Sequence, residues 1–206
     1  MKIDWRLCLV ADAEAAGERD ILSIIKEAVE GGVTLIQLRS KNLNARELLE
    51  ISLRASALLK RKNIPLIIND RVDIALACQA SGVHLGQQDL PPTYARKILG
   101  KSRIIGISVN TEEEAVNAEK GGVDYLGVGP IFSTLSKKDL RPFLGSEGLR
   151  MIRQKVKIPI LAIGGINATN AREVMEAGAS GIAVISAIMG AENIRKAAKE
   201  LRELIG

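Results

Sequence analysis

The feature that most constrains the fold is a regular alternation of short apolar runs with amphipathic segments, repeated eight times along the chain. Each apolar run is hydrophobic on both faces, which is typical of strands buried in a parallel sheet. The segments between the runs have the periodicity of amphipathic helices. We expect strands at 6–10, 35–39, 66–68, 83–85, 104–108, 125–128, 160–163 and 181–185. We expect helices at 20–30, 44–62, 71–79, 92–99, 111–120, 149–155, 170–176 and 192–204.

Glycines recur at the expected helix ends, each just before an apolar strand, where a helix C-cap favours them. Asn44 and Glu47 form a capping-box pattern at the start of the second helix. Eight such units in 206 residues predict an α/β protein with a closed (β/α)8 TIM barrel. The competing open doubly wound sheet lacks the expected G-x-G-x-x-G after its first strand. The glycine signatures are Glu-Gly-Gly-Val at 30–33, Ala-Ser-Gly-Val at 80–83, Lys-Gly-Gly-Val at 120–123 and Ala-Gly-Ala at 177–179.

Size and composition exclude several other classes of protein. A chain of 206 residues that is 47% apolar suits one core, so we expect a single domain spanning 1–206. The N-terminus lacks the pattern of a secretory signal, and the longest apolar stretch, 181–189, is about half of what a bilayer needs. Cys8 and Cys78 form no Cys/His cluster, which argues against zinc and favours a reducing compartment. We therefore expect a cytoplasmic protein with no membrane partner.

The net charge of +5 raises the question of nucleic acid, but aromatic residues make up only 2% of the chain. Stacking platforms are therefore nearly absent, and the basic residues are spread over most of the helices. We expect no nucleic-acid partner. The excess of cations fits a small anionic ligand as well as it fits a solvated basic surface. The sequence leaves a homo-oligomer open, because exposed helix faces cannot be ranked as interfaces.

The longest connection, at about 129–148, has no helical or strand period. Apolar residues such as Ile131 and Phe132 argue against disorder, so the segment is interpreted as an active-site or binding loop. A tolerated surface insertion is the alternative. Thr134, Ser136 and Lys137 in this loop offer hydroxyls and a charge suited to covering phosphates.

Barrel enzymes build their sites at the carboxyl ends of the strands. Gln37, Arg39 and Lys41 follow one another at every second position at the end of the second strand, so they share a face that should point into the mouth. Arg39 and Lys41 could instead be solvated loop residues, an interpretation that is acceptable for Lys41 alone but not for all three.

Two carboxylates follow the third and fourth strands. Asp70 comes after Asn69, and Asp89 precedes Pro91-Pro92. Taken singly, Asp70 could be a helix N-cap and Asp89 a turn residue. Neighbouring strand ends bring them together, and two carboxylates beside basic residues suit Mg²⁺, which prefers oxygen ligands and shares them with phosphates.

The remaining strand ends offer anion contacts. Ser108 ends the fifth strand and either donates into the mouth or caps a local turn. Gly164-Gly165 and Ile185-Ser186 end the last two strands, where barrels of this kind usually bind phosphate. A tight turn is the alternative for the glycine pair. His84 is the only histidine, and we expect it to be packed and hydrogen-bonded and not catalytic.

Seven segments, in their order and spacing over nearly the whole chain, resemble the thiamine-phosphate synthase family. The resemblance implies a TIM-barrel transferase that joins 4-amino-2-methyl-5-hydroxymethylpyrimidine diphosphate to a methylthiazole phosphate, giving thiamine phosphate and pyrophosphate. It implies Mg²⁺ as cofactor and leaves open whether the thiazole is carboxylated. The segments are IQLRSKN, IINDRVDIAL, GVHLGQQDLP, IGISVNTEEEA, DYLGVGPIFSTLSKKD, PILAIGGI and GIAVISAI.

The resemblance also implies roles for individual residues. Arg39, Lys41, Ser108 and Lys137 would be catalytic, and Asp70 and Asp89 would hold Mg²⁺. In the long loop the family usually shows Thr-x-Thr-Lys. Here Ser136 replaces the second threonine and keeps its hydroxyl, so this departure affects only the fine positioning of the group. The pyrimidine diphosphate would be bound by Gln37, Leu38, Arg39, Ser40, Lys41, Asn69, Ser108 and Lys137, and the thiazole phosphate by Thr134, Leu135, Ser136, Gly165, Ile185 and Ser186.

The implied chemistry agrees with these residue types. If pyrophosphate departs before the thiazole nitrogen attacks, catalysis consists of stabilising a leaving anion and holding a cationic pyrimidine beside a nucleophile. That nitrogen carries no proton, so no histidine base is required.

Two alternatives remain. One is the related thiazole tautomerase, which has a histidine where this chain has Pro130 after Gly129. Proline cannot transfer protons. The other is a barrel that binds phosphate ligands without catalysis, which would leave the two aspartates and Lys137 unexplained.

Overall fold

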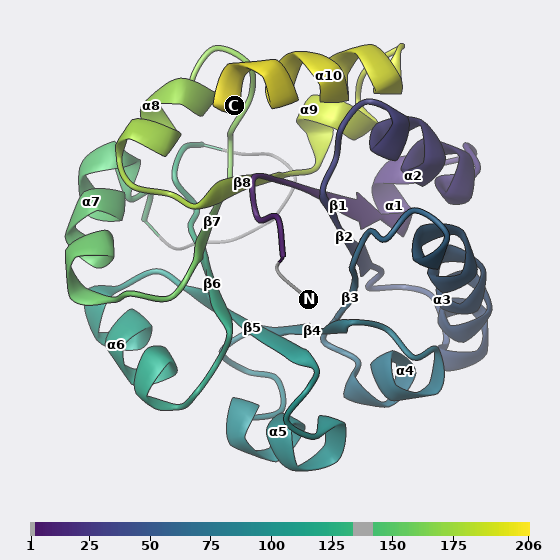
Figure 1. The fold of residues 1–206 in the computed structure, drawn as a ribbon, viewed down its shortest axis with the longest axis horizontal. Helices are drawn as coiled ribbons and strands as arrows, with labels where there is room; N and C mark the ends of the chain where they lie inside the picture. The colour runs from purple at the N-terminus through teal and green to yellow at the C-terminus, as the bar shows by residue number, and fades with distance from the viewer. Residues whose placement is uncertain (1–2, 134–141) are drawn as a thin grey trace.

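The computed structural model, which describes residues 3–133 and 142–206, is a closed barrel of eight parallel strands surrounded by helices (Figure 1). Each strand pairs with the next, and β8 pairs with β1 to close the ring. The predicted (β/α)8 barrel is confirmed. The strands are β1 (Leu7–Asp12), β2 (Leu35–Arg39), β3 (Leu66–Asn69), β4 (Gly82–Leu85), β5 (Ile104–Val109), β6 (Tyr125–Val128), β7 (Ile160–Ile163) and β8 (Gly181–Val184).

The helices lie outside the ring; α1 to α8 come between successive strands, and α9 and α10 follow β8 (Figure 1). Two short helices, α1 and α9, were not predicted. The helices are α1 (Ala13–Ala16), α2 (Ile21–Glu30), α3 (Ala45–Lys60), α4 (Val72–Ala77), α5 (Pro92–Leu99), α6 (Glu112–Lys120), α7 (Gly145–Lys155), α8 (Ala171–Glu176), α9 (Ser186–Met189) and α10 (Ile194–Ile205).

Local sequence signals explain where several helices begin and end. The capping box at α3 is confirmed: the Asn44 side chain accepts from the Glu47 backbone N–H at 3.1 Å, and the Glu47 carboxylate accepts from the Asn44 N–H at 3.0 Å. Gly32 and Gly122 follow helices at positive φ values of 103° and 76°, which glycine adopts without a steric penalty.

The predicted start of α7 at residue 149 was wrong, because the helix begins at Gly145. Backbone contacts with the loop that follows β6 explain the difference. The Gly145 N–H donates to the Ile131 carbonyl at 2.9 Å, and the Leu144 N–H donates to the Pro130 carbonyl at 3.0 Å. These tertiary hydrogen bonds hold a glycine-rich first turn that helix propensity alone disfavours.

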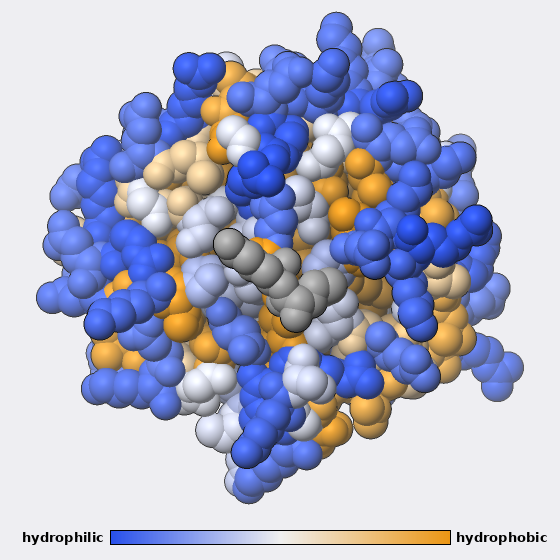
Figure 2. Space-filling view, in the orientation of Figure 1, coloured by the Kyte–Doolittle hydropathy of each residue, from blue (hydrophilic) through white to orange (hydrophobic). Residues whose placement is uncertain are grey.

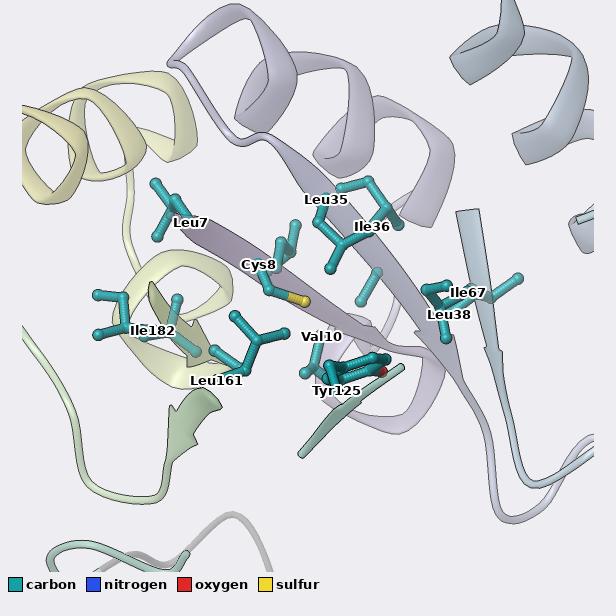
Figure 3. Close-up of a cluster of buried hydrophobic side chains, with 14 of the residues drawn as sticks. Leu7, Cys8, Val10, Leu35, Ile36, Leu38, Ile67, Tyr125, Leu161 and Ile182 are labelled. Atoms are coloured by element: carbon teal, nitrogen blue, oxygen red, sulfur yellow. The ribbon is translucent and has the colours of Figure 1, made fainter. Parts of the chain in front are cut away.

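Inward-pointing side chains fill the barrel. Figure 3 shows Cys8 of β1, Leu161 of β7 and Tyr125 of β6 among them. The Tyr125 ring requires glycine on the neighbouring strand, because a Cβ at Gly106 would lie 2.6 Å from the phenol oxygen. On the segment before β1, the Trp5 ring lies 4.9 Å from that of Tyr125, so the amino-terminal end of the barrel is closed by aromatic packing.

Figure 2 shows a face whose outline is mainly hydrophilic, with hydrophobic residues exposed among the hydrophilic ones. A groove of about 430 Å³ lies between the ends of α3 and α4, lined by residues such as Leu53 and Cys78, and is separate from the strand ends that carry the predicted site. Within residues 3–133 and 142–206, no helix has the length and hydrophobicity needed to cross a bilayer.

Candidate active site at the barrel mouth

The carboxyl ends of β1, β2 and β8 surround a cavity of about 410 Å³. It brings Arg39 and Lys41, predicted for one substrate, together with Ile185 and Ser186, predicted for the other. Ser186 begins α9 directly after β8. The lining residues are Asp12, Glu14, Ala15, Arg39, Lys41, Ile185, Ser186, Met189 and Gly190.

Arg39 is fixed by a carboxylate that the sequence did not identify. Its guanidinium forms an ion pair with Asp12, and the two side chains are only 14% and 5% exposed. The two residues are direct partners in the β1–β2 register. Asp12 also accepts from the Ala15 N–H at 3.0 Å, which caps α1. A pair this buried holds the guanidinium in one orientation at the rim of the cavity.

The loop after β2 is organised by Glu14. Its carboxylate accepts from the Ser40 hydroxyl at 2.5 Å and from the backbone N–H groups of Lys41 and Asn42 at 3.1 Å each. Although burial opposes the shift, the hydrogen bonds from Ser40 and the two amides hold the pKa of Glu14 below its ordinary value. The backbone that carries Lys41 is thereby set in place.

Asp70 lies at the next strand end and pairs with the Lys41 ammonium. The Asp70 N–H donates to the His84 carbonyl at 2.8 Å, which fixes the residue at a positive φ of 61°. Burial raises the pKa of Asp70, and the adjacent Asp89 carboxylate raises it further, against the lowering effect of Lys41. The alternative interpretation of Asp70 as an N-cap was wrong, since α4 begins at Val72 and its N-cap, Arg71, makes no side-chain cap bond.

Asp89 follows β4 and serves partly as the expected turn residue. Its carboxylate accepts from the Gly86 N–H at 2.7 Å. It also lies close enough to Asp70 to raise the pKa of that carboxyl. Asp70 and Asp89 are two crowded carboxylates, and the pKa of Asp70 is raised. A hard divalent cation would offset the repulsion between their charges, so these residues fit Mg²⁺. No group of three or more candidate metal ligands occurs in the part of the chain that the structure describes.

Below the mouth, Ser108 is joined to a buried polar network. His84 Nε2 lies 2.9 Å from the Ser108 hydroxyl, and His84 Nδ1 lies 2.8 Å from the Tyr125 hydroxyl. Gln37 of β2 lines the same small cavity as His84, Ser108 and Tyr125. The prediction that His84 is packed and hydrogen-bonded is confirmed, since it is 7% exposed. The sequence predicted Tyr125 only as a strand residue and not as a member of a polar network.

Two other residues predicted to bind the diphosphate are largely buried at the ends of β2 and β3. Leu38 is 1% exposed, so its side chain belongs to the core, and any contact with a ligand would come from its backbone. Asn69 is 9% exposed at the end of β3, in register with His84 of β4.

The glycine pair after β7 packs closely against the long loop. The Phe132 N–H donates to the Gly164 carbonyl at 3.0 Å. Gly165 has a φ of 67°, and a Cβ there would lie 2.8 Å from the Phe132 Cβ. Gly165 is not among the residues that line the cavity with Ile185 and Ser186.

Asn110, which sequence reasoning missed, joins the two ends of the long loop. Its side-chain amide donates to the carbonyls of Gly129 and Pro142, each at 3.2 Å. Residue 110 follows β5 directly, and a polar residue just beyond a strand end was the available signal. Thr134, Leu135, Ser136 and Lys137 lie outside the described residues.

Comparison with known proteins gives consistent results. A family model described as thiamine monophosphate synthase matches residues 7–188. The chain is 48% identical over 203 residues to a thiamine-phosphate synthase of Chloroflexus aurantiacus, covering 98% of this chain and 94% of that protein. It is 50% identical over 201 residues to one of Moorella thermoacetica, covering 98% and 96%. The solved structure of a thiamine phosphate pyrophosphorylase from Pyrococcus furiosus superposes with a TM-score of 0.89 at 44% identity, over 98% and 96% of the two chains.

Proposed function

The chain belongs to the thiamine monophosphate synthase family and is a transferase of thiamine biosynthesis, and from that premise we propose how its barrel mouth carries out the thiamine-phosphate synthase reaction. The substrates are 4-amino-2-methyl-5-hydroxymethylpyrimidine diphosphate and 4-methyl-5-(2-phosphoethyl)thiazole or its carboxylated form. The bond from the pyrimidine methylene carbon to the diphosphate oxygen breaks, and its electron pair leaves with pyrophosphate. The thiazole nitrogen lone pair then forms the new carbon–nitrogen bond.

One observation carries this proposal: a buried guanidinium, an ammonium and two crowded carboxylates meet at adjacent strand ends. Arg39 and Lys41 supply cations for the diphosphate, with Gln37, Leu38, Ser40, Asn69, Ser108 and Lys137 completing its site. Because Arg39 is oriented by Asp12 before any ligand arrives, little reorganisation is needed when negative charge develops on the leaving group.

Asp70 and Asp89 are the residues that would hold Mg²⁺. Bound there, the ion would supply positive charge to the departing pyrophosphate. The raised pKa of Asp70, caused mainly by burial and further by Asp89, supports this role, since a carboxylate whose charged form is destabilised gains most from a cation.

In this proposal the thiazole phosphate binds beside the diphosphate, where Ile185 and Ser186 line the same cavity as Arg39 and Lys41. Thr134, Leu135 and Ser136 of the long loop, Gly165 after β7, and Ile185 and Ser186 after β8 form its site. The close packing of the loop base against Gly164 and Gly165 supports a shared site for these segments. We place the reaction in the cytoplasm, and association with further copies of the chain stays a prediction.

The tautomerase alternative is not favoured. Pro130 follows Gly129 at the base of the long loop, where that chemistry needs a histidine, and a proline ring has no group that transfers a proton. The non-catalytic alternative is not favoured either, because the chain is about half identical to synthases over nearly its whole length.

A coupling assay tests the proposal. The purified protein receives both substrates and Mg²⁺, and thiamine phosphate and pyrophosphate are measured together, with EDTA as the control. We expect equal amounts of the two products, lost on chelation and restored by Mg²⁺. Failure to form product while both substrates bind would overturn the proposed reaction.

A further inference from the structure

Three donors from the loop after β2 converge on a single oxygen, Oε1 of the Glu14 carboxylate. The Ser40 hydroxyl donates to it at 2.5 Å, and the backbone N–H groups of Lys41 and Asn42 each donate at 3.1 Å. Successive backbone N–H groups aimed at one point resemble the concavities in which proteins hold anions. Here a carboxylate from the preceding strand–helix unit fills that place, so Glu14 closes the loop from outside.

The Ser40 hydroxyl is fully used inside this arrangement. A serine hydroxyl has one proton to donate and two lone pairs that accept. The proton goes to Glu14, and the oxygen accepts from the N–H groups of Asn42 at 3.2 Å and Leu43 at 3.0 Å. Ser40 therefore shapes the loop together with Glu14, and a ligand that took a hydrogen bond from its hydroxyl would have to break this set.

The helix that carries Glu14 is attached at both ends. A helix of four residues such as α1 does not persist by its own hydrogen bonds. Asp12 caps its start. Beyond its end, the Arg19 guanidinium donates to the Ala16 carbonyl at 3.4 Å and to the Met189 carbonyl, the last of α9. The carboxylate of Glu14 is thus presented to the loop from a fixed support.

The charge of Glu14 strengthens these contacts. Burial by itself raises the pKa of this carboxyl, but the hydrogen bonds from Ser40, Asn42 and Lys41 outweigh burial and lower the pKa overall. The group is therefore ionised at neutral pH, and hydrogen bonds to an ionised acceptor are roughly twice as strong as neutral ones. The backbone of Lys41 is fixed in this way before any ligand arrives.

We propose that Glu14 is a positioning residue, which closes the loop at 40–43 through one carboxylate oxygen, so that the side chain of Lys41, and not that of Ser40, meets the diphosphate. The role toward the substrate rests on the proposed function. The closure of the loop does not, because it is a property of the protein without ligand. A loop set in advance avoids the cost of ordering Lys41 when the diphosphate binds.

Hydrogen exchange tests the closure without substrate. In ¹⁵N-labelled protein, the amides of Lys41 and Asn42 should exchange about tenfold or more faster in Glu14→Ala than in the wild-type protein. The matched control is Glu119→Ala. Glu119 Oε1 likewise accepts from two successive amides, of Lys157 at 2.6 Å and Ile158 at 3.0 Å, where the chain enters β7 at the end of the barrel opposite the mouth. That variant should release its own two amides only. Unchanged exchange of Lys41 and Asn42 in Glu14→Ala would overturn the proposal.

Steady-state kinetics test the effect on the substrate. Glu14→Ala should raise the KM for the pyrimidine diphosphate by about tenfold and leave kcat and the KM for the thiazole phosphate unchanged. The sign is decisive, because a carboxylate that merely lined the cavity would repel a diphosphate, and its removal would lower this KM. Glu14→Gln keeps an acceptor oxygen without the charge and should raise the KM by about threefold. Glu119→Ala should lower Tm and leave every kinetic constant unchanged.

A double-mutant cycle separates the role of Ser40 from ligand binding. Ser40→Ala should raise the KM for the pyrimidine diphosphate in the wild-type background and change it little in Glu14→Ala, because both residues act through the same loop. Independent, multiplying effects would show that Ser40 contacts the diphosphate itself and would overturn the proposal. Far-UV circular dichroism and Tm show whether each variant is folded, and Glu14→Gln carries both tests if Glu14→Ala does not fold. Failure of the coupling reaction would leave the exchange measurements interpretable, so the two proposals fail separately.

Discussion

At the level of single residues, each of the two cations at the mouth is held by a carboxylate from a neighbouring strand end. Arg39 pairs with Asp12 from β1, and Lys41 pairs with Asp70 after β3. The two pairs differ in environment, since the Asp12 side chain is 5% exposed and the Lys41 side chain 54%. Desolvation makes the first pair rigid, while solvent leaves the second easier to exchange.

Asp12→Asn tests the orientation of Arg39. Asparagine keeps the volume and the α1 cap but removes the charge, so we expect kcat/KM to fall by roughly tenfold or more, the loss of one charge-assisted contact. Breaking a buried pair also lowers the free energy of unfolding, by about 3 kcal/mol. Steady-state kinetics and urea unfolding measure the two effects. Asp4→Asn is the control, because Asp4 pairs with Arg6 before β1 and should leave kcat/KM unchanged.

Asp70→Asn tests whether the charged carboxylate at the proposed metal site lowers the free energy of unfolding of the metal-free protein. The pKa of Asp70 is raised from 3.8 mainly by burial and further by Asp89, so the folded protein binds this proton more tightly than the unfolded chain. Stability from this group is therefore lost as pH rises from 3.8 through the folded pKa, and the penalty is complete above it. Without Mg²⁺ at neutral pH, Asp70→Asn should stabilise the protein by on the order of 0.5 kcal/mol while abolishing activity.

Thermal unfolding with and without Mg²⁺ measures this effect. The gain in Tm of the variant should disappear below pH 3.8, and Mg²⁺ should raise the Tm of the wild-type protein only. Asp73→Asn is the control with opposite sign, because Arg71 holds the pKa of Asp73 below its ordinary value. A lower Tm for Asp70→Asn in metal-free protein would contradict the expectation.

At the level of elements, the turn after β7 depends on glycine for two separable reasons. Gly165→Ala combines a positive φ of 67° with a Cβ placed 2.8 Å from the Phe132 Cβ. Gly100→Ala has a similar φ of 76° but nothing within 4 Å of the new Cβ. We expect Gly100→Ala to cost about 1 kcal/mol of unfolding free energy and Gly165→Ala about 2–3 kcal/mol. Only Gly165→Ala should raise the KM for the thiazole phosphate, and equal kinetics in both variants would contradict the close packing.

The strand–helix alternation predicted the barrel because every repeat has a strand that is apolar on both faces followed by a helical period, and four of the helices end in a glycine signature. Elements and element ends that show no hydrophobic period were not predicted. The four residues of α9 are too few to show one, and α7 begins at Gly145 through tertiary hydrogen bonds to Ile131. The candidate site divides in the same way. Position at strand ends predicted Arg39, Lys41, Ile185 and Ser186, which line one cavity in the structure, and their roles stay predictions.

Partners brought together by strand register were not predictable from local sequence. Asp12 and Arg39 are 27 residues apart and meet only because β1 and β2 pair in a particular register. The same holds for His84 and Tyr125, which are 41 residues apart. The sequence indicated a packed histidine but carried no local signal for the residues that its ring contacts.

At the level of the whole molecule, the ring closes at β8 and β1 beneath Trp5. Gly181 of β8 packs so tightly that a Cβ there would lie 2.6 Å from the Trp5 carbonyl carbon. Gly181→Ala should therefore cost more than about 2 kcal/mol, because the neighbouring atoms are backbone and cannot yield. Gly121→Ala, whose nearest contact would be 3.2 Å, is the milder control.

Trp5 is the only tryptophan, so its fluorescence reports the seam, meaning the contact between β8 and the Trp5 segment where the ring closes. Far-UV circular dichroism reports the helices. Both signals should shift to the same lower urea midpoint in Gly181→Ala, since a closed ring unfolds as one unit. A shift in fluorescence alone would mean that the seam opens independently of the rest.

Under the proposed function, the paired cations at the mouth would also affect how the protein releases its product. An incoming diphosphate would not meet unpaired cations, because Asp12 and Asp70 already serve as counter-ions to Arg39 and Lys41. Binding is therefore an ion exchange, and part of the attraction is used to displace these carboxylates. When pyrophosphate is formed, the same carboxylates compete for the cations it occupies. A mouth that neutralises itself limits product inhibition, so that turnover does not depend on a tightly held anion leaving unaided.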